Sequence, residues 1–100
     1  MKTVKTTVWD PAEYLETAED IAIYLEDVFS TNDPHLIVAA IGDVARARGM
    51  TKISEDIACS RESLYKSLSL DGNPSFDTVL KVMLSLGYGI KPAQVSMSTS

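Results

Sequence analysis

Two short apolar patterns of helical spacing, separated by a tight corner, constrain the fold of this chain more than any other feature. The stretch from Met50 to Gly87 reads MTKISEDIACSRESLYKSLSLDGNPSFDTVLKVMLSLG. Ile53 and Ile57 mark the inner side of a first helix, and Leu64 and Leu68 mark that of a second. Exposed long polar side chains on the second helix are what the major groove of DNA accepts. The spacing therefore predicts a helix-turn-helix.

The corner between these two helices is expected at Ala58-Cys59-Ser60. Ser54 is small enough to let the helices cross closely, and Cys59 can fill the corner by packing. Thr51 is expected to cap the first helix and Ser60 the second. Helix N-termini capped in this way can bind a DNA phosphate through their amides and hydroxyls.

The outer face of the second helix carries the candidate base contacts. Arg61 and Lys66 can reach guanine edges or phosphates, and Glu62 can accept a hydrogen bond from cytosine. Tyr65 can contact a thymine methyl group or a phosphate. The competing interpretation is a helical corner that only packs against the rest of the protein.

Helix-start signals precede this segment. Asp10 can cap a helix with Pro11 at its first position and Glu13 completing a capping box, and Trp9 and Tyr14 can form a hydrophobic staple around the cap. An apolar stripe then continues to Phe29. Because Thr17 and Asp20 can also begin a helix, the sequence leaves open whether this region is one helix or two.

The next helix is expected to begin at Pro34, capped by Asp33, and to end at Gly49. Arg46 and Arg48 fall in its last turn, where cations suit the helix dipole. The residues expected on its inner side are Leu36, Ile37, Ala40, Ile41, Val44 and Ala45.

A strong turn at 71–74 is followed by a last helix, capped by Ser75 and ended by Gly87. The residues expected inward or half-buried on it are Phe76, Val79, Leu80, Val82, Met83 and Leu86. Tyr88 to Val95 fits an edge strand or an extended tail, and residues 96–100 are expected to be disordered. The predicted fold is all-α, a single domain over 1–100, with an N-terminal helical extension (10–33) and a core (34–91).

Charge divides the chain into two halves. Residues 1–45 hold two lysines and nine acids, 2 − 9 = −7, and residues 46–100 hold seven cations and five acids, 7 − 5 = +2, which together give the net charge of −5. This split favours two surfaces with two kinds of partner, nucleic acid on the basic half and a basic protein on the acidic half. The alternative for the acidic half is a solvated surface.

Several classes of function are disfavoured. No apolar run is long enough for a membrane span, and the first residues do not resemble a secretory signal, so we expect a cytoplasmic protein. The single Cys59 and the single His35 have no Cys/His cluster around them, which predicts neither a metal site nor a nucleophile. There is no glycine-rich phosphate loop. We therefore expect no enzyme, no cofactor and no metal.

Taken together, these segments resemble a known family. The stretch Arg46 to Gly87 is similar to the lambda-repressor-like, Xre-type helix-turn-helix, and Trp9 to Lys91 resembles the HigA-type addiction-module antidote proteins. The motifs that carry the resemblance are WDPAEYL, EDIAIYLEDVF, LIVAAIGDVARARGMT, SRESLYKSLS and DGNPSFDTVLKVMLSLG. The resemblance implies an antitoxin that binds a small RelE/HigB-like RNase toxin and represses its own operon as a homodimer on palindromic DNA. It places the DNA contacts at Thr51, Lys52, Ser60, Arg61, Glu62, Tyr65 and Lys66.

Two positions depart from the family pattern. Ala58 stands where the corner usually has glycine, which would strain the backbone by about 1 kcal/mol if its φ is positive. Lys52 stands where the leading helix usually has glutamine. The lysine keeps a donor for phosphate and loses the acceptor that would bridge to the recognition helix.

The leading hypothesis is an antitoxin-type repressor whose acidic N-terminal elements hold a small basic toxin. The apolar anchors for the toxin are expected at Trp9, Tyr14, Leu15, Tyr24 and Leu25. Two alternatives remain open: a plain Xre-type transcriptional regulator without a toxin, and a helical protein-interaction module without DNA binding.

Overall fold

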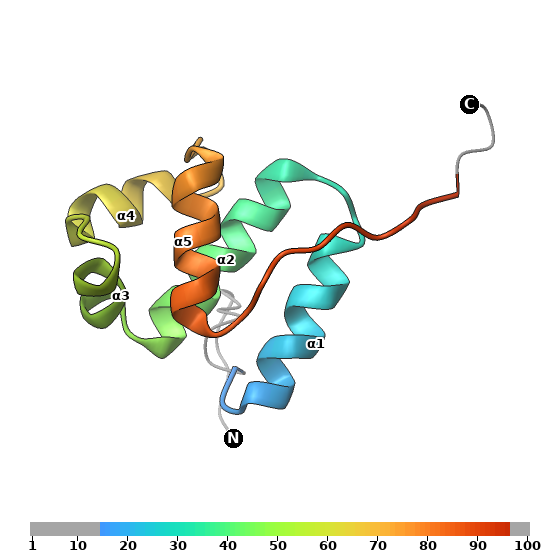
Figure 1. Ribbon diagram of the computed structural model, residues 1–100, viewed down its shortest axis with the longest axis horizontal. Coiled ribbons are helices and arrows are strands. Elements are labelled where there is room, and N and C mark those ends of the chain that lie inside the picture. Colours follow the sequence, from blue (N-terminus) through green and yellow to red (C-terminus); the bar gives the residue numbers. More distant parts are fainter. Residues whose placement is uncertain (1–14, 97–100) are drawn as a thin grey trace, which may run out of the picture.

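Five helices and no strand make up residues 15–96, which are the residues that this computed structural model describes (Figure 1). This confirms the all-α prediction. The helices are α1 (Ala18–Phe29), α2 (Pro34–Arg48), α3 (Met50–Asp56), α4 (Arg61–Ser67) and α5 (Phe76–Leu86). None of them is long and apolar enough to cross a membrane, as far as residues 15–96 are concerned.

The helix α2 is the centre of the arrangement. It contacts α1, α3 and α5, and α3 in turn contacts α4 and α5. Figure 1 shows α1 on one side of α2 and the α3–α4 pair on the other. The acidic α1 and the α3–α4 pair therefore lie on different sides of α2, whereas the segment after α5 runs back over α1.

Thr17 and Asp20 begin α1. The Thr17 hydroxyl accepts a hydrogen bond from the Asp20 amide at 3.0 Å, and the Asp20 carboxylate accepts one from the Thr17 amide at 3.3 Å. This capping box marks the N-terminal end of α1, and Leu15 and Glu16 before it are not helical. A helix that runs unbroken from Asp10 to Phe29 therefore does not form. The predicted cap, proline start and staple at residues 9–14 lie outside the described residues.

The start of α2 is as predicted and the start of α3 is not. Asp33 accepts hydrogen bonds from the amides of His35 and Leu36, and Pro34 occupies the first helical position. Gly49 ends α2 with φ 117°, a value that favours glycine, and the chain passes directly from this residue into α3. Thr51 therefore lies inside α3 rather than capping it, and α3 has no side-chain cap.

The core lies where α2 meets the other helices. Its largest fully buried side chains are Ile21, Ile41, Val44, Leu64, Leu68 and Val82. Two residues expected on inner faces are instead exposed, Leu36 by 44% and Phe76 by 66%. Each belongs to the first turn of its helix, where no other part of the described chain covers it.

The end of α5 leads into an irregular segment. Gly87 adopts the left-handed conformation (φ 96°), and the Tyr88 amide reaches back to the Met83 carbonyl at 2.9 Å, which closes the last turn. Of the two alternatives for 88–95, the extended segment forms and the strand does not. It packs against the core through Tyr88 and Ile90, and the Tyr88 hydroxyl donates to the Ala18 carbonyl at 3.3 Å.

Candidate functional site

The turn at 57–60 sets the angle between α3 and α4. Ala58 has φ 56°, a left-handed conformation that L-residues with a Cβ rarely adopt. The Cys59 amide donates to the Ser54 carbonyl at 3.0 Å, which ties the turn to α3. Ser60 then caps α4, because its hydroxyl accepts from the Ser63 amide at 3.0 Å. The sequence placed both the corner and this cap correctly.

Burial of one side of α4 determines which side faces solvent. Leu64 is 0% exposed and Leu68 1% exposed, so both are held by the core. The backbone of α2 comes very close to the end of α4 at Gly42, where a Cβ atom would lie 3.2 Å from the Leu68 Cβ and would overlap the Leu68 carbonyl oxygen. Gly42 is thus a contact point between α2 and the segment that carries the polar face.

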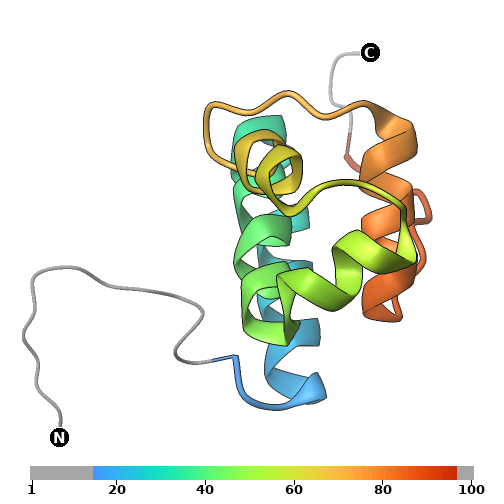
Figure 2. The ribbon, with the colours of Figure 1, turned by 90° about the vertical axis from the view of Figure 1, so that its left-hand side faces the viewer.

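All seven residues expected to contact DNA are exposed. They are Thr51, Lys52, Ser60, Arg61, Glu62, Tyr65 and Lys66. Figure 2 looks at the molecule from the α3–α4 end and shows both helices on the face nearest the viewer. Tyr65, with 43% of its surface exposed, is a large side chain available to a partner on this face.

A hydrogen bond across the two helices was not anticipated. The Arg61 guanidinium donates to the Thr51 hydroxyl at 3.2 Å. Lys52 instead approaches the Asp56 carboxylate at 3.5 Å, one turn along α3. The side-chain hydrogen bond between α3 and α4 is thus made by Arg61 and Thr51 and not by residue 52. The only signal for it in the sequence was that Lys52 lacks the acceptor that a glutamine would provide.

Charge on the described residues follows the same division as along the sequence. Residues 46–69 hold five cations and three acids, 5 − 3 = +2, whereas residues 15–45 hold seven acids and no lysine or arginine, 0 − 7 = −7. A phosphate backbone is thus attracted to the α3–α4 end and repelled from the α1 end.

Three of the expected toxin anchors fall within the described residues, and none is freely exposed. Leu15 and Leu25 belong to the core, with exposures of 8% and 5%. The hydroxyl of half-buried Tyr24 donates to Asp43 at 2.7 Å, and Asp43 also pairs with Arg46. The apolar periodicity of the sequence could not show whether these side chains pack against α2 or face a partner protein. Trp9 and Tyr14 lie outside the described residues.

Burial, followed by the hydrogen bond to the Asp43 carboxylate, raises the pKa of Tyr24 above its ordinary value. The phenol therefore stays protonated and remains a donor that joins α1 to α2. The outward surface of α1 is formed instead by Ile23, which is 57% exposed, among exposed acids. These acids are Glu16, Glu19, Asp20, Glu26 and Asp27.

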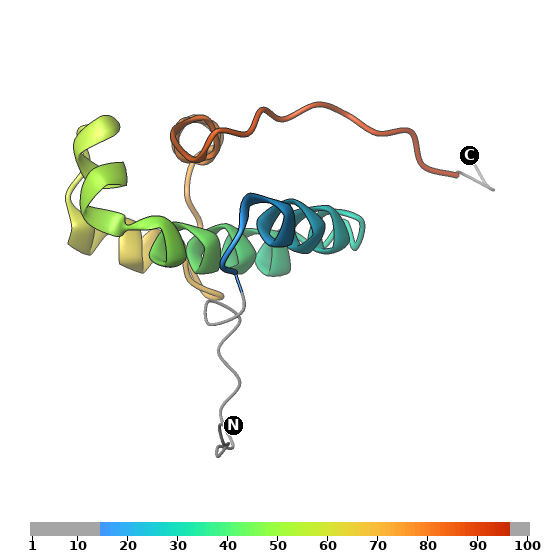
Figure 3. The ribbon, with the colours of Figure 1, turned by 90° about the horizontal axis from the view of Figure 1, so that it is seen from below.

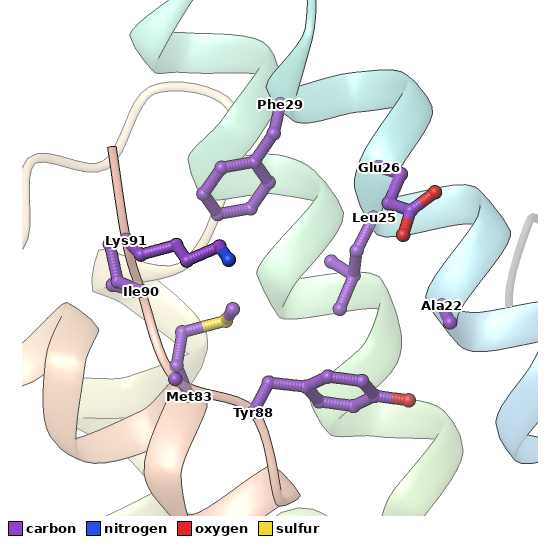
Figure 4. A pocket seen from close by; sticks show the side chains of 9 residues that line it. Ala22, Leu25, Glu26, Phe29, Met83, Tyr88, Ile90 and Lys91 are labelled. Atoms are coloured by element: carbon purple, nitrogen blue, oxygen red, sulfur yellow. The ribbon is translucent and has the colours of Figure 1, made fainter. Parts of the chain in front are cut away.

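A cleft of about 280 Å³ lies between α1 and the segment that follows α5 (Figure 4). Leu25, Phe29, Met83 and Tyr88 supply much of its wall, with the charged Glu26 and Lys91 also in its lining. Cofactor and drug-sized sites are generally larger and carry several convergent polar groups. The cleft has room for an apolar side chain of a partner.

No candidate metal site is found among residues 15–96. No group of three potential ligands comes together there. His35 points its Nδ1 at the Leu70 carbonyl, 3.2 Å away, and Cys59 is half-buried against the core. Both side chains are explained by packing and local hydrogen bonding.

Comparison with known proteins identifies relatives. A family model described as "Probable addiction module antidote protein" matches residues 5–94. A curated protein of Haemophilus influenzae (strain ATCC 51907 / DSM 11121 / KW20 / Rd), described as uncharacterized, is 49% identical over 86 residues, which are 86% of this chain and 89% of that protein. No solved structure matches the chain.

Proposed function

The chain belongs to the family of probable addiction module antidote proteins, and from that membership we propose that it is the cytoplasmic antitoxin of a toxin–antitoxin pair. It has no catalytic role in this proposal. It neutralises a small basic RNase toxin of the RelE/HigB-like class and, as a homodimer, binds operator DNA to repress its own genes. The two tasks use opposite ends of the molecule.

One observation carries the DNA-binding part of the proposal. Leu64 and Leu68 are fully buried while Arg61, Tyr65 and Lys66 on the same segment are exposed. A short helix held this firmly by one side presents the other side in a fixed orientation, which reading base edges requires. Ser60 adds a capped N-terminus that can face a phosphate.

Arg61→Ala and Lys66→Ala test this interface. Neither residue lies in the core, so the fold is expected to survive. If Arg61 makes a bidentate contact with guanine, its loss lowers discrimination by roughly 1–3 kcal/mol, whereas loss of a phosphate contact weakens binding to all sequences alike. The measurement is a mobility shift with the DNA upstream of the chain's own gene, at fixed salt, against scrambled DNA. Circular dichroism monitors helicity.

Lys91→Ala is the matched control, because it removes an exposed cation far along the chain from α4. Its effect on DNA affinity is expected to be small. If Arg61→Ala and Lys66→Ala bind the operator as tightly as this control does, α4 is not the reading helix. If the unmodified chain captures its toxin and shifts no DNA, it is an interaction module without DNA binding.

For the toxin, we propose the outward face of α1 around Ile23, together with Trp9 and Tyr14. Leu15 and Leu25 support this face from the core, and they do not reach the surface. An exposed apolar side chain encircled by carboxylates suits a basic partner, since the apolar group supplies affinity and the charges speed encounter. A toxin gene beside this one distinguishes the proposal from a plain Xre-type regulator.

A further inference from the structure

The cleft beside α1 combines two aromatic rings with a carboxylate. Phe29 from α1 and Tyr88 from the segment after α5 are half-buried in its lining, and the exposed Glu26 contributes from the α1 side. Figure 4 shows both rings and the Glu26 side chain around the same space. Aromatic faces and carboxylates are the groups that attract a cationic side chain. The lining therefore suits a basic group better than a purely apolar one.

The two walls of the cleft are held in place by the fold. Figure 3 shows the segment after α5 running along one side of α1. The Tyr88 amide donates to the Met83 carbonyl at 2.9 Å, and the Tyr88 hydroxyl donates to the Ala18 carbonyl at 3.3 Å, so the segment is tied to both helices. Leu25 and Met83, which are buried, complete the apolar lining. A partner therefore meets a preformed cleft, and its binding orders little of these walls.

The chain's own Lys91 shows that a basic side chain fits this lining. Figure 4 shows the Lys91 side chain pointing toward α1, with Phe29 and Met83 on either side of it. Its aliphatic stem thus lies along apolar surface, as the stems of lysine and arginine commonly do. Neither Lys91 nor Glu26 takes part in an ion pair within residues 15–96. The Glu26 carboxylate is therefore available to a cation from a partner.

We propose that this cleft receives an arginine side chain of the basic toxin. The methylene stem of the arginine packs against the apolar lining, its guanidinium lies against the ring of Phe29 or Tyr88, and the Glu26 carboxylate pairs with it. Arginine suits this cleft better than lysine, because the planar guanidinium stacks on aromatic rings and binds a carboxylate through two N–H groups. The exposed Lys91 turns out to solvent when the arginine enters.

Charge favours a basic protein as the source of this side chain. Residues 15–45 hold seven acids and no lysine or arginine, so a basic surface is drawn to α1 before any side chain enters the cleft. An acidic or neutral partner that covered the cleft would leave the Glu26 carboxylate desolvated and unpaired, which is unfavourable. This inference deepens the proposed function and rests on it for the identity of the partner. The preference of the cleft for a cation does not depend on it.

Surface plasmon resonance with the full chain and the product of the neighbouring toxin gene tests the carboxylate. Glu26→Gln is expected to raise the dissociation rate of the complex by about tenfold, because it removes the group that holds the guanidinium. Asp27→Asn is the matched control. It removes the same charge from the next residue of α1, which does not line the cleft, and it is expected to change the association rate alone.

Two variants change the space in the cleft in opposite directions. Ala22→Phe puts a ring where Figure 4 shows a small side chain in the lining, and it is expected to weaken toxin binding by about tenfold or more. Lys91→Ala removes a like charge and a side chain that occupies part of the cleft, and it is expected to lower the dissociation constant by about threefold. Circular dichroism checks that helicity is unchanged in both.

A methyl signal reports on the cleft without the toxin. Met83 lines the cleft, whereas Met50 is buried in the core away from it. In the full chain with methyl-labelled methionine, a blocked tripeptide with a central arginine is expected to shift the Met83 resonance and to leave that of Met50 in place. The same peptide with glutamate instead of arginine is expected to shift neither. Met83→Leu assigns the resonance.

The outcomes separate this inference from the proposed function. If the arginine peptide shifts Met83 and the chain captures no toxin, the cleft stands and the antitoxin proposal fails. If the toxin is captured with the Met83 resonance unmoved, and Glu26→Gln and Ala22→Phe bind it like the unmodified chain, the inference is overturned and the proposed function stands. If deletion of residues 1–14 by itself shifts Met83, the chain's own N-terminal segment occupies the cleft, and this also overturns the inference.

Discussion

At the scale of single residues, Ala58 occupies the most demanding backbone position in the α3–α4 pair. Its φ of 56° lies in the left-handed region, which costs an L-residue with a Cβ about 1 kcal/mol or somewhat more. Ala58→Gly is therefore expected to raise the free energy of unfolding by up to about 1 kcal/mol, since part of the gain is offset by the freedom of glycine in the unfolded chain. Urea melts measure the change, and a loss of stability would contradict the strain.

Tyr24 makes the other residue-scale prediction. Burial and the Asp43 hydrogen bond raise its pKa above the ordinary 10.0, so the folded chain holds the phenol proton more tightly than the unfolded chain does. The resulting stabilisation is complete below pH 10 and is lost as the pH rises through the raised value. We expect Tyr24→Phe to cost about 1 kcal/mol at neutral pH. The gap between the two proteins should shrink in melts above pH 10, and a constant gap would contradict the shift.

At the scale of elements, helix ends were predictable where a side chain forms the cap. Asp33, Ser60 and Ser75 were expected as caps and all three cap their helices. The prediction that Thr51 caps α3 was wrong, because Gly49 is both the C-cap of α2 and the N-cap of α3. The apolar periodicity identified the side of each helix that faces the core, but not which apolar residues at the edge of that side are exposed. The apolar character of Phe76 indicated burial, yet nothing in the sequence reported whether a neighbour covers the first turn of α5.

Packing between elements gives the element-scale prediction, at Gly42 of α2. Alanine favours helix over glycine by about 1 kcal/mol, yet Gly42→Ala is expected to lower the free energy of unfolding by about 1–3 kcal/mol. The reason is that the added methyl group would overlap the Leu68 carbonyl, which belongs to backbone and cannot rotate away. Ala47→Gly, at an exposed position of the same helix, measures the difference in helix propensity between alanine and glycine without a packing contribution. A stabilised Gly42→Ala would mean that α2 and α4 lie farther apart.

At the scale of the whole molecule, α1 is acidic and the α3–α4 pair is mildly basic, and they lie on different sides of α2, although Lys91 from the basic half of the sequence lies beside α1. Sequence reasoning identified the acidic end and the basic end because charge is counted without knowing the fold. It could not identify which apolar residues of the acidic end reach the surface, since Leu25 and Ile23 differ only in the direction they face from α1. The exposure of the seven residues proposed to contact DNA was easier to predict, because polar residues on the side of a helix opposite buried leucines face the solvent.

The last prediction concerns that acidic end. Ile23→Ala is expected to raise the dissociation rate of the complex with the product of the neighbouring toxin gene, by roughly tenfold if Ile23 is a buried anchor. Glu19→Gln combined with Asp27→Asn is expected to lower the association rate and its dependence on salt, because rim charges act mainly on encounter.

Glu55→Gln, on an exposed acid of α3, is the control and should change neither rate. Surface plasmon resonance at two salt concentrations measures both. DNA affinity should be unchanged in the two α1 variants, because α1 and the α3–α4 pair lie on different sides of α2. If both α1 variants bind the toxin like the unmodified chain, the face around Ile23 is not the docking site. Deletion of residues 1–14 then tests Trp9 and Tyr14 alone, and it leaves the Thr17 cap and Leu15 in place so that α1 is expected to form.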